Sequence, residues 1–399
     1  MNKVELLAPA GSLEKCAYAF AYGADACYAG TADFSLRVKE NTITLDDIKQ
    51  GIDLAHKLDK KFYVTINIYA HNKHLVNLPE YVKKIKELKP DAIIASDLGV
   101  ISTVKEYWPE AVIHLSTQAN CTNWRAAKFW FEQGIERVIL AREVSLSEIK
   151  TMHEKIPSVE IEAFVHGAMC LAYSGRCVLS AALAGRSANL GDCAQCCRWS
   201  YNLVEEKRPG EYLPIQQDDH GTYILSSKDM CMIEYLDNLL DAGVCSLKIE
   251  GRNKSIFYLA HIIRAYRKVL DGAWSARQGK EEILKVSTRQ LHTGFFLDQE
   301  AEQDPDLRRG QAQYKFVGEI INVDEKNNHL ATVRVHNELC VGDIIEIISS
   351  DDNFEFTIKE MKKDDTGEIM AEAHGGSGDI VKIDFQKPVQ IKNLLRIKQ

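Results

Sequence analysis

VELLAPAG, at residues 4–11, is a short apolar run that ends in glycine, and the segment after it places Leu13, Cys16 and Phe20 at helical spacing. The same pairing of an apolar run with a helical segment recurs along the chain as far as residue 253. Short apolar strands that alternate with helices are typical of βα units, whose strands lie parallel in one sheet. This stretch therefore indicates an α/β fold for the larger part of the chain.

Eight such runs precede residue 253, and eight βα units predict a closed (β/α)8 barrel of the TIM type. A doubly wound open sheet is the alternative, because it is built from the same units. The eight runs are VELLAPAG (4–11), ADACYAG (24–30), KFYVTINI (61–68), AIIASD (92–97), VIHLSTQ (112–118), RVILARE (137–143), EIEAFVHG (160–167) and CSLKIEG (245–251).

Polar residues gather where these runs end. The active sites of (β/α)8 barrels lie at the C-terminal ends of the strands, so a barrel brings these residues to one face. Strand ends are often polar because they meet solvent, so the set is more informative than any single member. The residues are Asn67, Asp97, Thr117, Gln118, Arg142, Glu143, His166, Lys248 and Glu250.

Changes in the pattern of expected strands and helices divide the chain into domains. Residues 1–300 are expected to form the barrel domain, with a cysteine-rich insertion at about 168–240, where the connection is far longer than the usual loop. Residues 301–313 read as a charged linker. Short alternating strands separated by glycine and aspartate turns follow at 314–399, and they predict a small all-β barrel or sandwich.

Composition narrows the class of protein. The chain has 399 residues, of which 45% are hydrophobic and 27% charged, ordinary values for a soluble globular protein. Its formal net charge of -8 argues against a nonspecific nucleic-acid coat, although a local basic groove is compatible with it. There is no apolar run of signal-peptide or membrane-spanning length, so we expect a cytoplasmic protein without a membrane partner.

Cysteines are concentrated in the insertion, and five of the eleven lie between Glu162 and Trp199. Reducing conditions in the cytoplasm favour a metal site over disulfides. The only close pairing is a C-x2-C-C triple, whereas the other spacings are wide. Wide spacing suits thiolates that converge from separate loops, as at an iron–sulfur cluster, and zinc is the alternative metal. The six candidate ligands are Cys170, Cys177, Cys193, Cys196, Cys197 and Cys231.

A cysteine nucleophile is a further interpretation, with His166 as the base and Glu162 as the group that orients it. Nucleophilic catalysis requires one activated thiol, so it does not explain the neighbouring cysteines.

Long motifs in the insertion resemble a known family. The segments FVHGAMCLAYSGRCVLS, GDCAQCCRWSY, SSKDMCMIEYL and SLKIEGRNKS resemble the signature segments of peptidase family U32, the collagenase-like proteins, as do the opening ELLAPAGSLEKCAYAFAYGADACYAG and FSLR at 34–37. The C-terminal VGDIIEI module resembles the accessory β domain of the branch that hydroxylates tRNA. The resemblance extends over essentially the whole chain.

The resemblance implies an enzyme that uses a 4Fe–4S cluster to hydroxylate the tRNA wobble uridine to 5-hydroxyuridine, with prephenate as co-substrate or required metabolite. It places the cluster on Cys170, Cys177, Cys193 and Cys231, with Cys197 as an alternative ligand and Cys196 as the least probable of the six. Hydroxylation of ribosomal RNA or of a quinone precursor is a further alternative, as is a collagenase-like peptidase. The peptidase has weak support because no H-E-x-x-H or G-x-S-x-G motif is present.

Position beside the insertion suggests roles for other residues. Arginine and lysine at the strand ends are candidates for binding an anionic metabolite, since guanidinium groups match carboxylate and phosphate oxygens. Expected partners are tRNA, a small anionic metabolite and a possible protein partner; a non-catalytic RNA-binding subunit is the remaining alternative. The candidate anion-binding residues are Arg37, Arg142, Arg176, Lys248 and Arg252, and the candidate proton-transfer residues are Glu162, His166 and Glu250.

Overall fold

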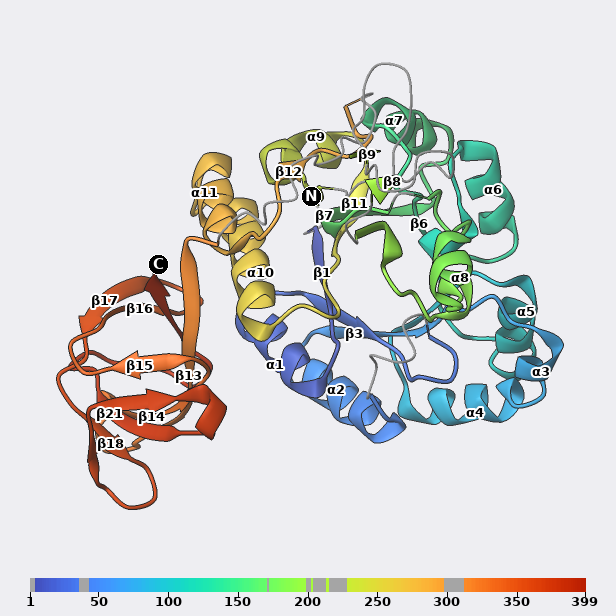
Figure 1. Cartoon of the computed structure of the whole chain (residues 1–399). Helices are drawn as coiled ribbons and strands as arrows, with labels where there is room; N and C mark the ends of the chain where they lie inside the picture. The colour runs from blue at the N-terminus through green and yellow to red at the C-terminus, as the bar shows by residue number, and fades with distance from the viewer. Residues whose placement is uncertain are drawn as a thin grey trace.

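The computed structural model describes residues 4–35, 43–170, 172–198, 202–203, 213–214, 228–297 and 312–399. They form a ring of strands and helices, with an all-β domain beside it at the C-terminal end of the chain (Figure 1).

Eight parallel strands close the ring. Each pairs with the next along the chain, and the last strand, β11, pairs with both β7 and β1. The predicted (β/α)8 barrel is therefore confirmed, and the open doubly wound sheet is wrong. The strands are β1 (Glu5–Pro9), β2 (Ala26–Ala29), β3 (Lys61–Ile66), β4 (Ala92–Ala95), β5 (Ile113–Leu115), β6 (Arg137–Ile139), β7 (Glu160–Ala168) and β11 (Val244–Ile249).

The local sequence explains these elements. Strands such as β2 and β4 are buried along their whole length. One face of a barrel strand packs in the barrel interior, and the other packs against the surrounding helices. Helices begin at capping residues, including Ser12, Thr44 and Ser255, whose side chains accept hydrogen bonds from backbone N–H groups of the first turn. None of the helices in the described ranges combines the length and the apolar character needed to span a membrane.

The outer ring comprises α1 (Leu13–Ala21), α2 (Leu45–Lys57), α3 (Asn72–Leu75), α4 (Leu78–Leu88), α5 (Leu98–Tyr107), α6 (Trp124–Glu132), α7 (Leu146–Lys155), α9 (Leu236–Asp241) and α10 (Ile256–Leu270), with α11 (Ala276–Val286) packed on α10 (Figure 1).

The connection between β7 and β11 departs from the βα pattern. It contains α8 (Leu179–Ala184), the two-stranded pair β8 (Asn202–Leu203) and β9 (Leu213–Pro214), and β10 (Asp229–Cys231). β10 runs antiparallel to β7, so the chain turns back along the barrel wall before α9 begins. β12 (Leu291–His292) then adds to β10 in parallel.

The C-terminal domain is a strongly curved antiparallel sheet, so the all-β expectation is confirmed. Its order is β17-β16-β22-β13-β14-β21-β18-β19, and in the described chain its two edge strands do not pair with each other. The strands are β13 (Tyr314–Val323), β14 (Leu330–Val335), β16 (Ile344–Ile348), β17 (Asn353–Thr357), β18 (Met361–Lys363), β19 (Ile369–Met370), β21 (Ile380–Asp384) and β22 (Leu394–Lys398), with β15 (Glu338–Cys340) and β20 (Glu372–His374) as a separate pair.

A buried ionic contact joins the two domains. Arg396 of β22 is fully buried, and its guanidinium donates to Glu282 Oε1 of α11 at 2.7 Å and to Glu346 at 2.9 Å. The Tyr22 hydroxyl, at the end of α1, donates to the carbonyl oxygens of Ile348 and Lys392. Because these polar groups satisfy one another out of water, they fix the β domain against α1, α10 and α11.

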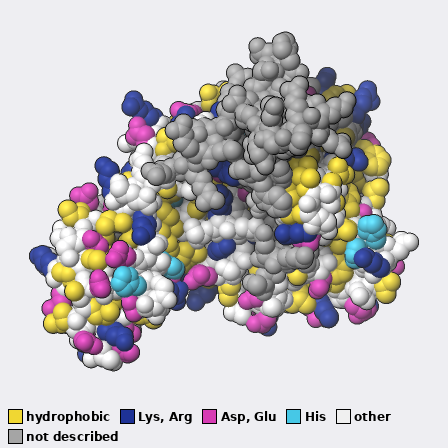
Figure 2. Space-filling view, in the orientation of Figure 1, with side chains coloured by type: hydrophobic (Ala, Val, Ile, Leu, Met, Phe, Trp, Pro, Cys, Tyr) yellow, Lys and Arg dark blue, Asp and Glu magenta, His cyan; other side chains and the backbone are white. Residues whose placement is uncertain are grey.

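On the face that Figure 2 shows, Lys and Arg side chains of the C-terminal domain are interspersed with Asp and Glu. This face of the domain therefore has no large surface of a single charge.

Candidate functional site at the mouth of the barrel

A cavity of about 280 Å³ lies where the strand ends meet the cysteine-rich connection. Its wall combines residues from the ends of several barrel strands with residues between 170 and 197. Six of the nine strand-end residues singled out in the sequence lie in this wall: Asn67, Thr117, Gln118, Arg142, Lys248 and Glu250.

Two of the other strand-end residues have structural partners. Asp97 caps α5, where its side chain accepts from the N–H groups of Gly99 and Val100. Glu143 accepts from the backbone N–H of Ser174 at 2.9 Å and so holds the cysteine-rich connection against the barrel.

His166 faces away from the cavity. The pairing register of β7 and β11 shifts between Phe164 and His166, and this bulge reverses the alternation of side chains. The imidazole consequently lies fully buried against α10, with Nε2 3.0 Å from the Tyr258 hydroxyl and Nδ1 3.4 Å from the Tyr266 hydroxyl. Burial lowers the pKa of His166 to about 4, so the ring is neutral at pH 7. The proton-transfer role of His166 remains a prediction, and the buried position of the imidazole against α10 does not support it.

Glu162 lies below the cavity, in the barrel interior, and supports Lys248. Its carboxylate is fully buried and accepts from Lys248 Nζ at 2.7 Å, from Arg137 Nη1 at 3.2 Å and from the Ser246 hydroxyl at 3.1 Å. Burial alone would raise the pKa of Glu162, but Lys248 and Arg137 outweigh it and lower that pKa below its ordinary value. Glu162 is therefore an ionised counter-charge that holds Lys248, whose Nζ lies 4.3 Å from the centre of the Tyr28 ring.

Arg252 is the second buried cation of the cavity wall. It donates to the Ser35 hydroxyl at 3.0 Å and to the Thr65 hydroxyl at 3.4 Å. Gly30 makes room for this arrangement, because a Cβ there would lie 2.2 Å from Thr65 Oγ1. Arg176 is not among the residues of the cavity wall, and Arg37 lies outside the described residues.

Four cysteines share the cavity wall. Cys170, Cys177, Cys193 and Cys197 line it, and Cys170 is exposed. Cys231 lies instead on β10, buried beside α10, where the Tyr266 hydroxyl donates to its Sγ at 3.9 Å. Burial raises the pKa of Cys231 to about 11. The ligand set of Cys170, Cys177, Cys193 and Cys231 stays a prediction, and the structure places three of its members on the cavity.

The chemistry of this donor set fits an iron–sulfur cluster. No disulfide joins cysteines of the described residues, and four of these cysteines line one solvent-accessible cavity, whereas no histidine lines the described wall. Sets of cysteine thiolates are typical of iron–sulfur clusters and of structural zinc.

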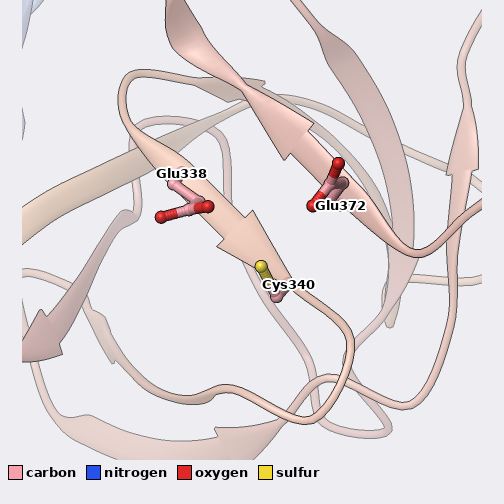
Figure 3. Close-up of side chains that lie close together, drawn as sticks. All are labelled: Glu338, Cys340 and Glu372. Atoms are coloured by element: carbon pink, nitrogen blue, oxygen red, sulfur yellow. The ribbon is translucent and has the colours of Figure 1, made fainter.

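A separate group of possible ligands lies in the C-terminal domain. Glu338, Cys340 and Glu372 have their ligand atoms within 4.8 Å of one another on β15 and β20 (Figure 3). Both carboxylates are exposed, and burial together with Asp343 and Glu338 raises the pKa of Cys340. A raised pKa disfavours the thiolate that a metal ion requires, and we assign no function to this group.

Sequence reasoning missed the aromatic part of the wall. Tyr28 and Phe164 lie beside Lys248 and Arg142, within cation–π distance. Both face the barrel interior, which alternation along β2 and β7 could have revealed.

The fold and the site define a TIM-barrel protein with a cavity at the C-terminal ends of its strands, lined by thiols, cations and aromatic rings. The chain belongs to peptidase family U32. The model of that family matches residues 11–306, and the model of the family's C-terminal domain matches residues 312–396.

Two relatives match nearly the whole chain, and a third matches about two thirds of it. It is 41% identical to tRNA hydroxylation protein P of Escherichia coli, over 94% of this chain and 92% of that protein. It is 38% identical to tRNA hydroxylation protein P1 of Bacillus subtilis, over 99% of this chain and 95% of that protein. It is also 36% identical to the 23S rRNA 5-hydroxycytidine C2501 synthase of Escherichia coli, over 68% of this chain and 40% of that protein.

Proposed function

We propose that this protein is an iron–sulfur enzyme that hydroxylates the wobble uridine of tRNA to 5-hydroxyuridine with prephenate as its co-substrate. The observation that carries the proposal is the convergence of Cys170, Cys177 and Cys193 with Lys248 and Arg252 on a single cavity. The names of the relatives support RNA hydroxylation as the class of reaction, and the tRNA proteins match over more of their length than the ribosomal RNA synthase does.

The thiols would hold the cluster. Cys170, Cys177 and Cys193 supply three ligands, and Cys231 is the fourth that the motif implies, with Cys197 as the alternative already on the cavity wall. A bound 4Fe–4S cluster supplies electron transfer, with a potential set by its ligands and by hydrogen bonds to sulfur.

The cavity walls suit a small carboxylate with an apolar ring. Lys248 and Arg252 are buried cations held in fixed positions, and buried cations attract carboxylates more strongly than exposed ones because less water screens them. Tyr28 and Phe164 add apolar surface beside them. The protein's own residues therefore bind and orient the anion, while Glu162 keeps the ammonium of Lys248 in place.

A peptidase is less well supported. A cysteine nucleophile needs a base within hydrogen-bonding reach, and His166 lies behind the barrel wall in contact with Tyr258. No histidine takes its place among the described residues of the cavity wall.

Mass spectrometry of tRNA nucleosides from a deletion strain, with and without the gene restored, tests the substrate. We expect 5-hydroxyuridine and its derivatives to disappear on deletion and to return with the wild-type gene but not with Cys170→Ala. Unchanged nucleosides would exclude the tRNA substrate. Iron and sulfide analysis of anaerobically purified protein tests the cluster, and stoichiometric zinc would exclude it.

A further inference from the structure

Arg142 connects the cysteines to the cavity. It follows β6 and lies in the cavity wall, with its guanidinium carbon 4.3 Å from the centre of the Phe164 ring. Its Nη1 donates to Cys170 Sγ at 3.1 Å, within the usual range for a donor to sulfur. The side chain thus contacts a predicted cluster ligand and the cavity at the same time.

The partners of Arg142 differ from those of the two other cations in the wall. Lys248 has the carboxylate of Glu162, and Arg252 has the hydroxyls of Ser35 and Thr65. Arg142 forms no salt bridge with any described residue, and its Nε is buried without a hydrogen-bond partner there. A buried donor without a partner costs free energy, so an acceptor supplied by a ligand would stabilise this arginine.

We propose that Arg142 is a positioning residue that couples the binding of a carboxylate in the cavity to the iron–sulfur cluster at Cys170. The proposal rests on the cluster of the proposed function. A cationic N–H donor stabilises the extra negative charge of the reduced cluster and so raises its reduction potential. A carboxylate in the cavity that pairs with the guanidinium offsets part of this positive charge. Binding of the anion therefore lowers the potential of the cluster.

Redox titration of the anaerobically purified holoprotein, followed by electron paramagnetic resonance, tests the coupling. We expect Arg142→Gln to lower the midpoint potential and Arg142→Lys, which keeps the charge, to lower it less. Arg125→Gln is the matched control, because it removes the same charge at an exposed residue of α6 that is not in the cavity wall. Prephenate is expected to lower the potential of the wild type and of Arg125→Gln, and to leave that of Arg142→Gln unchanged.

The possible outcomes separate this inference from the proposed function. Wild-type protein without iron and sulfide would refute the cluster itself. A loaded wild type whose potential matches that of Arg142→Gln would refute the coupling alone, as would equal shifts in Arg142→Gln and Arg125→Gln. If Arg142→Gln does not retain the cluster, the wild type decides, and a midpoint potential that prephenate leaves unchanged would refute the coupling.

Discussion

The buried carboxylate of Glu162 offers the most direct test of how the barrel supports its site. We expect Glu162→Gln to destabilise the protein, because it removes the only carboxylate that pairs with Lys248 in the described structure and one of three that pair with Arg137. An amide of the same shape keeps the packing but leaves the buried ammonium without a counter-charge. Removal of one partner from a buried ion pair costs about 3–5 kcal/mol.

Thermal and chemical denaturation measure this loss. For a barrel of this length the destabilisation corresponds to a melting temperature roughly 5–8 °C lower. Glu160→Gln is the matched control, since Glu160 pairs with the same Arg137 at 2.7 Å but has a side chain that is 54% exposed. An exposed pair contributes about 0–1 kcal/mol, so this variant should stay close to the wild type.

The pH dependence gives a second readout of the same pair. The pKa of Glu162 is lower in the folded protein than its ordinary value. The contribution of Glu162 to the free energy of unfolding is therefore complete above the ordinary pKa, and it disappears as the pH falls through the lowered pKa. The difference in stability between wild type and Glu162→Gln should therefore shrink in acid. Equal stability of Glu162→Gln and Glu160→Gln at pH 7 would refute the view that Glu162 holds Lys248 as an ionised group.

Three further predictions test the rest of the structure. Cys231→Ala should lower the iron content of the purified protein while Cys197→Ala retains it, and the reverse result would assign the fourth ligand to Cys197. Arg252→Lys should raise the KM for prephenate about tenfold or more, because lysine cannot reproduce the two hydroxyl contacts; an unchanged KM would remove Arg252 from the anion site. The pKa of Glu282 is lowered to about 2, because Arg396 outweighs the effect of burial. The contact between the domains should therefore weaken as the pH falls from about 4.5 towards 2. Calorimetric scans with identical transitions across that range would contradict this.

The barrel could be predicted from sequence because its signals are local. Each strand is a continuous apolar run, and capping residues such as Ser12 and Ser255 mark where helices begin. Because the barrel closes, the polar residues at the strand ends meet at one face, and six of the nine line the cavity.

Other features depend on contacts that no local pattern encodes. The bulge beside Val165 turns His166 outward, although regular alternation would point it inward with Phe164. Because β10 runs antiparallel to β7, Cys231 lies behind the barrel wall, away from the other predicted cluster ligands. The pairing of Arg396 with Glu282 joins residues 114 positions apart, and only the packed domains bring them together.

The distribution of charge reconciles an acidic chain with the anion site proposed above. The chain as a whole has a net charge of -8, yet the described cavity wall contains three cations, Arg142, Lys248 and Arg252, against one carboxylate, Glu250. Burial lowers the pKa of Lys248, and Glu162, which is not in the cavity wall, opposes that effect by pairing with the ammonium. Long-range attraction of polyanions is therefore weak, while a small carboxylate inside the cavity meets positive charge at short range. In the proposed site, selection of the anion would thus depend on fit within the cavity and not on the overall charge of the protein.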